Sequence, residues 1–178
     1  MSGAREQLRT VALDEINVYA RPLLIVHADF ILRFTRHTDY ALRVLIYAGL
    51  KGEEQSTIAE IAARYRISEN HLMKVVHHLG LGGYVATTRG RKGGLRLARP
   101  PEEISIGDVV RWCEEDLRIV ECLDPATNTC PIIRFCGLTQ TVGEALEAFL
   151  AVLDDKTLAD VLASSRGVER ALQLTEPG

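Results

Sequence analysis

Apolar residues recur with helical spacing from residue 39 onward. Over about 39–50 they are numerous enough to bury most of one helix, and Thr38 stands where it can cap the first turn. A second helix is expected over about 57–64, because Thr57 and Glu60 form the Thr-x-x-Glu pattern of a capping box. The pattern therefore predicts two consecutive helices before residue 65.

A third helix is expected over about 69–79, after a three-residue turn and an N-cap at Ser68. Two helices joined by so short a turn predict a helix-turn-helix unit. The apolar positions of the third helix share one face, and they are Leu72, Val75, Val76 and Leu79. The other face offers groups that can hydrogen-bond base edges and phosphates, so the candidate DNA contacts are Ser68, Asn70, His71 and Lys74. An ordinary amphipathic helix is the alternative, and it is the preferred interpretation of His77 and His78.

Residues 84–97 alternate between apolar and polar positions in the manner of two short strands. The loop between them is rich in glycine, which permits tight turns and a close approach to a phosphate chain or a minor groove. Its tip carries three further candidate DNA contacts, Arg89, Arg91 and Lys92. The pattern predicts a β-wing. A nucleotide-binding loop is disfavoured because the G-x4-G-K-[ST] motif is absent.

Two more helices are expected downstream. Residues 105–115 form a short amphipathic segment that contains Cys113. We interpret Cys113 as a core or surface thiol, although its C-x8-C spacing to Cys122 would let it substitute for a ligand. A longer helix of about sixteen residues begins near residue 138 and carries an apolar stripe at 4-3-4-3 spacing, made by Leu138, Val142, Ala145, Phe149 and Val152. Because this stripe is wider than one small domain needs, it predicts a partner helix from a second copy of the chain.

The predicted fold class is mainly α with a small β-wing: a winged helix-turn-helix domain, a cysteine loop and a long dimerisation helix. The expected divisions are an N-terminal extension of unknown role (1–32), the winged helix-turn-helix domain (33–100), a connecting helix and cysteine loop (101–137), the dimerisation helix and tail (138–165), and a flexible C-terminus (166–178).

The distribution of charge along the chain indicates a binding partner. The net charge is only −3, yet residues 64–99 contain eight basic residues against one acid: Arg64, Arg66, Lys74, Arg89, Arg91, Lys92, Arg96 and Arg99 against Glu69. Because this block coincides with the third helix and the wing, nucleic-acid phosphate is the favoured partner. No apolar run is long enough to span a bilayer and no signal-peptide pattern is present, so we expect a cytoplasmic protein.

Three of the four cysteines lie at a C-x7-C-x5-C spacing within residues 121–137: Cys122, Cys130 and Cys136. Turn-forming residues around them predict a loop that can direct the sulfurs towards one point. A reducing compartment disfavours disulfides, so a metal or iron-sulfur cluster is the favoured ligand. Three thiolates are one short of the usual four, which requires a fourth ligand from elsewhere. Structural thiols, or a disulfide with one Cys left over, are the alternative.

Asp39 lies at the beginning of the first predicted helix, four residues before Arg43. A carboxylate there is favoured by the helix dipole, and the i,i+4 spacing allows an ion pair with Arg43. From the residues alone, this structural role is preferred to a more specific one.

From about residue 33 to residue 162 the chain resembles the IscR-like family of winged-helix iron-sulfur repressors, and within it the nitric-oxide-sensing NsrR group. The matching segments are RFTRHTDYALRVLIYA, ISENHLMKVVHHLG, RGRKGGLRLA, IGDVVR, ECLDPATNTCPI with FCGL, and EALEAFLAVLDDKTLADV.

The resemblance implies a homodimeric transcriptional repressor that binds a double-stranded DNA operator and is not an enzyme. It implies that Cys122, Cys130 and Cys136 hold an iron-sulfur cluster, with 4Fe-4S favoured over 2Fe-2S, and that nitric oxide abolishes DNA binding by destroying it. In one branch of the group, an aspartate in the first helix of the other subunit supplies the fourth ligand. Asp39 occupies the matching position, with Arg43 beside it in the cluster environment.

Two alternatives stay open. An iron- or redox-responsive regulator of the same family can share this Cys spacing, whereas the IscR branch uses a His soon after its last Cys, and residues 137–142 contain none. A small redox iron-sulfur protein that does not bind DNA would need the cysteine loop but would have no use for the basic wing.

Overall fold

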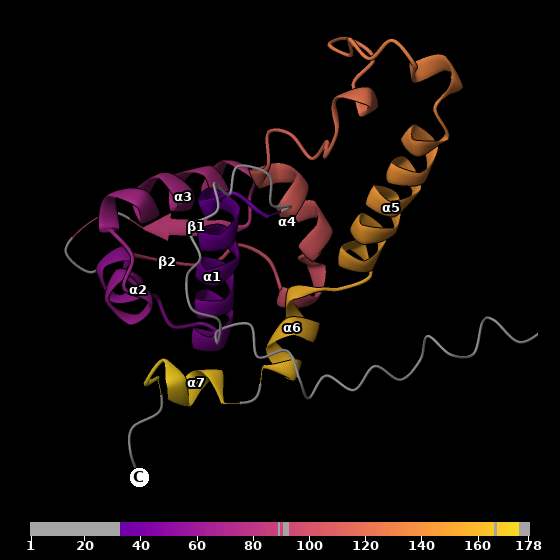
Figure 1. The fold of residues 1–178 in the computed structure, drawn as a ribbon. Helices are drawn as coiled ribbons and strands as arrows, with labels where there is room; N and C mark the ends of the chain where they lie inside the picture. Colours follow the sequence, from indigo (N-terminus) through magenta and orange to yellow (C-terminus); the bar gives the residue numbers. More distant parts are fainter. Residues whose placement is uncertain (1–32, 89, 91–92, 166, 175–178) are drawn as a thin grey trace, which may run out of the picture. The chain divides into compact units, whose positions relative to one another are not determined.

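A computed structural model describes residues 33–88, 90, 93–165 and 167–174. Helix α1, Arg36–Lys51, lies at the centre of the helical bundle (Figure 1). The elements packed against it are α3 (Glu69–Leu81), α4 (Ile106–Cys113), α6 (Leu158–Ser164) and strand β2 (Gly94–Leu97). Because neighbours surround it, α1 buries an apolar surface made by Ala41, Val44, Leu45, Tyr47 and Ala48.

Helix α1 begins one turn earlier than the sequence predicts. Its N-cap is Thr35, whose hydroxyl accepts a hydrogen bond from the Thr38 backbone N at 3.3 Å. The prediction of a cap at Thr38 is therefore wrong. Thr38 lies inside the helix with no exposed surface, and its hydroxyl is 3.1 Å from that of Thr35. Both threonines suit a cap locally, and the burial of Thr38 in the core decides between them.

The helix-turn-helix prediction is confirmed. Helix α2, Ile58–Tyr65, begins with the expected capping box between Thr57 and Glu60, and it ends at Arg66, which adopts the left-handed conformation with φ of 56°. Glu60 also accepts a hydrogen bond of 2.7 Å from the hydroxyl of Tyr47, which ties α2 to α1. Burial, followed by this bond to a carboxylate, raises the pKa of Tyr47 to about 12. Helix α3 follows after a short turn and runs to Leu81 rather than Leu79.

The wing is confirmed as an antiparallel pair of strands, β1 (Val85–Thr88) and β2, in which Val85 pairs with Leu97 and Thr88 with Gly94. Ser56, before α2, extends the pairing through two hydrogen bonds with Leu95, of 2.9 Å and 2.7 Å. At Gly94 a Cβ atom would lie 2.8 Å from the Ser56 carbonyl oxygen. Glycine at this position therefore lets the strand join the helix-turn-helix unit.

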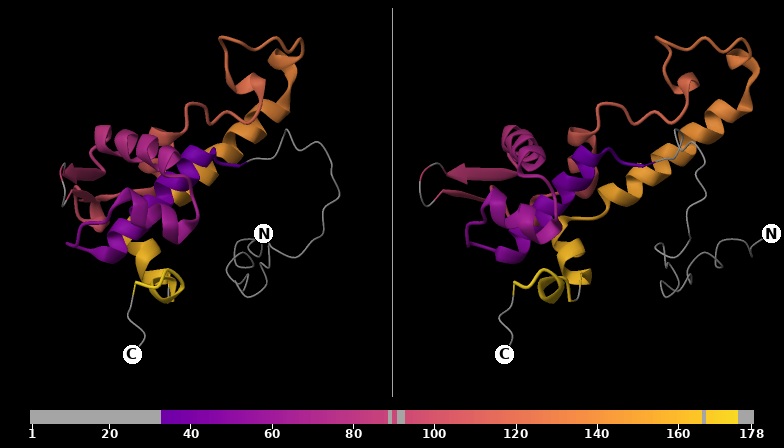
Figure 2. Two further views of the ribbon diagram at one scale, coloured as in Figure 1. Left: turned by 90° about the vertical axis from the view of Figure 1, so that its left-hand side faces the viewer. Right: turned by 60° about the vertical axis from the view of Figure 1, so that its left-hand side comes forward.

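After a 3-10 turn at Pro101–Glu103, the chain forms α4 and then the segment that carries the three clustered cysteines. That segment contains two more 3-10 turns, η3 (Glu121–Leu123) and η4 (Ile133–Phe135). Helix α5, Gly137–Asp154, then leads back to the bundle, with the cysteine segment at its far end (Figures 1 and 2). None of the helices in the described ranges is long and apolar enough to cross a membrane.

Polar contacts hold together the two ends of the segment that runs from α4 through the cysteines to the end of α5. Arg111 on α4 makes a bidentate ion pair with Asp154 on α5. The hydrogen bond from Nη2 to Oδ2 is 2.7 Å long. Backbone hydrogen bonds join Ile106 N to the Lys156 carbonyl at 2.9 Å and Leu158 N to the Ile104 carbonyl at 2.8 Å. The chain therefore leaves the bundle and returns to it at one place.

The C-terminal helices α6 and α7 (Val168–Ala171) belong to the bundle. Leu158 is fully buried, and Leu172, just after α7, is 8% exposed within the same core as α1. Part of the segment 166–178 thus packs on the core, while the division of the chain into functional regions stays a prediction.

Candidate functional site

The face of α3 that is predicted to contact DNA is exposed. Leu72, Val75, Val76 and Leu79 point into the core, as their spacing predicts. All four candidate contacts on the opposite face are exposed: Ser68, Asn70, His71 and Lys74. Ser68 occupies the N-cap position, yet its side chain makes no capping bond. The face can therefore offer hydroxyl, amide, imidazole and ammonium groups to a ligand.

Some of the basic residues serve the fold itself. The guanidinium of Arg99 lies 4.6 Å from the centre of the Tyr84 ring and donates to the carbonyls of Gly82 and Gly83. Arg64 donates to the Gln173 side chain at 2.7 Å. The three candidate contacts at the wing tip, Arg89, Arg91 and Lys92, lie outside the described residues, so their predicted role is untested.

Asp39 and Arg43 come together as predicted. Arg43 donates to both carboxylate oxygens of Asp39, at 2.8 Å from Nη2 and 3.1 Å from Nε. Its guanidinium also lies near the rings of Tyr40 and Tyr65, 5.8 Å and 5.9 Å from their centres. Both partners of the pair are about two-fifths exposed. The carboxylate is therefore held in place by Arg43 and is still open to solvent.

The cysteine segment is shaped by Asp124. Its carboxylate accepts a hydrogen bond from Ala126 N at 3.0 Å and one from the Thr127 hydroxyl at 2.7 Å, and it contacts the guanidinium of Arg118. The Thr127 and Ala126 hydrogen bonds, with the charge of Arg118, hold the pKa of Asp124 below its usual value. Asn128 likewise accepts a hydrogen bond from Cys130 N at 3.0 Å. Side chains close to the cysteines thus set the turns, as the composition predicts.

Cys122, Cys130 and Cys136 are all free thiols of intermediate exposure, so no disulfide joins them. Their donor chemistry fits an iron-sulfur cluster, because thiolates are its usual ligands. Within the described residues, their sulfurs do not form a group close enough to share one metal ion. The three thiols therefore fit a cluster in their chemistry, although their sulfurs are not gathered at one point within the described residues.

Helix α5 presents the predicted apolar stripe to solvent. Leu138 and Val152 are 61% and 64% exposed, and Phe149 is 37% exposed although its ring lies 6.0 Å from that of Phe34. No residue of α5 is buried. An apolar surface of this size on an eighteen-residue helix is typical of an interface.

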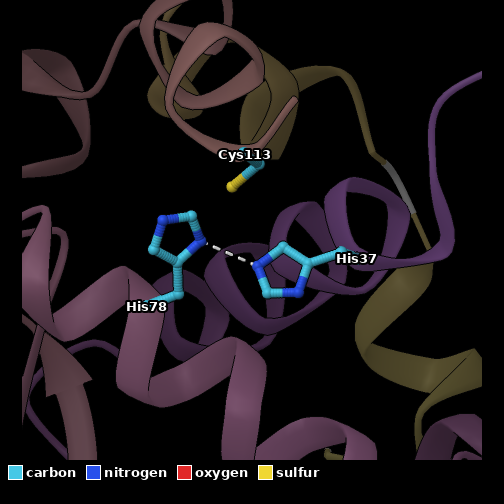
Figure 3. Close-up of side chains that lie close together, drawn as sticks. All are labelled: His37, His78 and Cys113. Carbon is cyan, nitrogen blue, oxygen red and sulfur yellow. Dashed lines mark hydrogen bonds between the residues drawn. The ribbon is translucent and has the colours of Figure 1, made fainter. Parts of the chain in front are cut away.

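The structure also brings together three residues that the sequence did not group. His37 on α1, His78 on α3 and Cys113 on α4 point towards one another, with ligand atoms all within 4.8 Å (Figure 3). His78 is half-buried and shares a hydrogen bond of 2.8 Å with His37, so it is a satisfied histidine of an amphipathic helix. Each residue lies on a different helix with no motif spacing between them, and no sequence signal could have found the group.

The fold and the exposed face of α3 define the class: a winged helix-turn-helix protein with an appended cysteine segment. The Rrf2 family, described as an iron-dependent transcriptional regulator, matches residues 34–164. The chain belongs to the Rrf2 family of transcriptional regulators, and its relatives are regulators rather than enzymes.

Individual relatives agree with this assignment. The chain is 49% identical over 146 residues to the HTH-type transcriptional regulator NsrR of Bacillus subtilis, which covers 82% of this chain and all of that protein. Among solved structures, the global cysteine regulator CymR of B. subtilis matches with a TM-score of 0.61 and 29% identity, over 76% of this chain and 99% of that one. IscR of T. potens matches with a TM-score of 0.60 and 26% identity, over 82% and 93%.

Proposed function

We propose that this protein is a cytoplasmic, dimeric transcriptional repressor whose operator binding is controlled by an iron-sulfur cluster that senses nitric oxide. The observation that carries the proposal is the set of three free thiols on the segment between α4 and α5, in a chain whose α3 offers an open polar face. Similarity to regulators named NsrR supports the choice of signal.

On the DNA side, α3 would enter the major groove. Asn70 and His71, in its N-terminal half, would contact base edges, while Lys74 and the Ser68 hydroxyl would contact phosphates. Arg89, Arg91 and Lys92 at the wing tip would add phosphate or minor-groove contacts. Because the winged helix-turn-helix unit reads one half-site, the apolar face of α5 would pair with that of a second copy and place two reading helices on one operator.

On the sensing side, Cys122, Cys130 and Cys136 would hold the cluster, and Asp39 of the partner subunit would complete it. The cluster supplies iron that nitric oxide can bind. A carboxylate is a harder ligand than a thiolate and suits a cluster iron less well, so Asp39 would mark the most easily released position. Arg43 would orient the carboxylate, and Asp124 would hold the loop turn beside Cys122. Contact between the loop of one chain and α1 of the other would fix the spacing of the two reading helices.

The DNA proposal is tested by comparing two substitutions on α3. Asn70→Ala is expected to lose most of the discrimination between operator and mutated operator, because each base-edge contact contributes about 1–3 kcal/mol of discrimination. Lys74→Ala is expected to weaken binding to both sequences about equally and to lower the salt dependence by about one phosphate contact. Binding isotherms at several salt concentrations measure both effects. Equal loss of specificity in the two variants would contradict this division of roles.

The sensing proposal is tested with Asp39→Ala beside Arg43→Ala. Asp39→Ala is expected to retain a cluster with an altered absorbance spectrum, a changed nitric-oxide titration and weaker operator binding. The Arg43 variant separates the roles, because it removes the ion pair and leaves the carboxylate. If Asp39 only pairs with Arg43 and interacts with the helix dipole, the two variants will behave alike. An Asp39→Ala protein identical to wild type would remove Asp39 from the site.

The family description, an iron-dependent regulator, favours a second candidate signal. An iron sensor would release DNA when iron is withdrawn by a chelator, without any nitric oxide. Anaerobic operator binding followed during separate titrations with nitric oxide and with an iron chelator distinguishes the two. We expect stoichiometric nitric oxide to release the DNA while the chelator leaves the loaded protein bound.

A further inference from the structure

We propose that His37, His78 and Cys113 form a second metal site, separate from the cysteine loop, that takes a zinc-class divalent cation. The three side chains converge between α1, α3 and α4 (Figure 3). His37 Nε2 and His78 Nδ1 share a hydrogen bond of 2.8 Å, which a bound cation would replace, and the thiol of Cys113 lies beside them. Two imidazoles and a thiolate are a donor set that zinc uses, with a fourth position left for water or an exogenous ligand.

The observed distances are close to those that a bound cation requires. Metal–nitrogen bonds of about 2.0–2.1 Å and a metal–sulfur bond of about 2.3 Å place tetrahedral ligand atoms roughly 3.3–3.6 Å apart. The two nitrogens would separate by roughly half an ångström, and the sulfur, which lies within 4.8 Å of both, would approach by at most about 1 Å.

The surroundings hold the group in place. The imidazole of His78 stacks on Trp112, with ring centres 5.2 Å apart, and the indole N donates to the His78 carbonyl at 3.1 Å. Cys113 is only 6% exposed. Burial, followed by the nearby charge of Glu114, raises the pKa of its thiol to about 11, so a cation would have to displace the thiol proton.

Charge favours a divalent cation. Two neutral imidazoles and one thiolate around a dication leave one positive charge. The carboxylate of Glu114, which accepts a hydrogen bond from Thr35 N at 2.7 Å, is close enough to His37 to favour positive charge there. Burial, and then the nearby His78, nevertheless lower the pKa of His37, which favours the neutral imidazole that a metal ligand requires.

A cation here would join the beginning of α1, the second half of α3 and the end of α4. It would therefore fix the reading helix relative to the helix that leads into the cysteine segment. The proposal of a metal site depends only on the positions of the three side chains. Its expected effect on DNA binding also rests on the proposed function.

The test uses anaerobic full-length protein as isolated, dialysed against Zn²⁺ and analysed for zinc and iron. We expect one zinc per chain with unchanged iron content. Competition with a chromophoric chelator should show at least a hundredfold weaker zinc binding in His78→Asn and in Cys113→Ser. The matched control is His77→Asn, which alters the exposed neighbour on the same helix and should bind zinc like wild type.

The triple variant Cys122→Ser, Cys130→Ser, Cys136→Ser separates this site from the proposed cluster. It should still bind one zinc per chain, whether or not the protein senses nitric oxide. Retention of zinc affinity in His78→Asn would overturn the proposal, as would loss of zinc binding in the triple variant alone. His78→Asn keeps the test informative if Cys113→Ser fails to fold.

Discussion

Cys130→Ala protein is expected to carry no stable iron-sulfur cluster and to bind its operator at least a hundredfold more weakly than wild type. Cys130 lies between the other two thiols in sequence, and its loss leaves two cysteines for a cluster that normally takes four ligands. Iron and sulfide analysis, visible absorbance and anaerobic operator binding measure the result.

The control is Thr129→Ala, an exposed residue next to Cys130 whose side chain makes no hydrogen bond within the described residues. It should keep both the cluster and the DNA affinity. Two outcomes would contradict the proposal: a Cys130→Ala protein with full iron content, or one that loses its cluster and binds the operator as tightly as before.

Leu138→Glu combined with Val152→Glu should convert the proposed dimer to a monomer. Both side chains are more than three-fifths exposed on α5, and burying each in a dimer would contribute about 1.5–3 kcal/mol. In a two-fold symmetric dimer each substitution is present in both chains, and the introduced glutamates would face one another across the interface. We expect the dimer dissociation constant to rise at least a hundredfold, measured by sedimentation, with a comparable loss of operator affinity.

Leu81→Glu is the matched control. Leu81 is 67% exposed at the end of α3, so the substitution adds the same charge to an exposed leucine away from α5. It should leave the protein dimeric. A dimer that survives both substitutions on α5 would mean that another surface joins the two copies.

Local signals predicted much of the fold. The capping box of Thr57 and Glu60, the buried face of α3 and the alternating wing depend on neighbours within a few residues, and all three are confirmed. The start of α1 was predicted wrongly, because Thr35 and Thr38 look alike locally and differ only in burial. Helix α3 continues through Gly80 because the left-handed turn is formed later, at Gly83.

The candidate site was only partly predictable. Cys122, Cys130 and Cys136 were found because they are close in sequence, and Asp39 with Arg43 because they are one helical turn apart. The grouping of His37 with His78 and Cys113 depends on how three helices pack, and a pattern along the chain contains no such information. The inclusion of Leu158 and Leu172 in the same core as α1 is not predictable for the same reason.

The closed base of the segment between α4 and α5 has a consequence for how this protein can diverge. Arg111 and Asp154, with the backbone bonds at Ile106 and Leu158, hold both ends of the segment whatever lies at its tip. The free energy of closing a flexible loop rises by only about 0.6 kcal/mol for each doubling of its length. Insertions, deletions and exchanged ligands at the tip therefore cost the bundle little stability. Mutations can therefore change the ligands of the proposed cluster while the rest of the molecule stays folded.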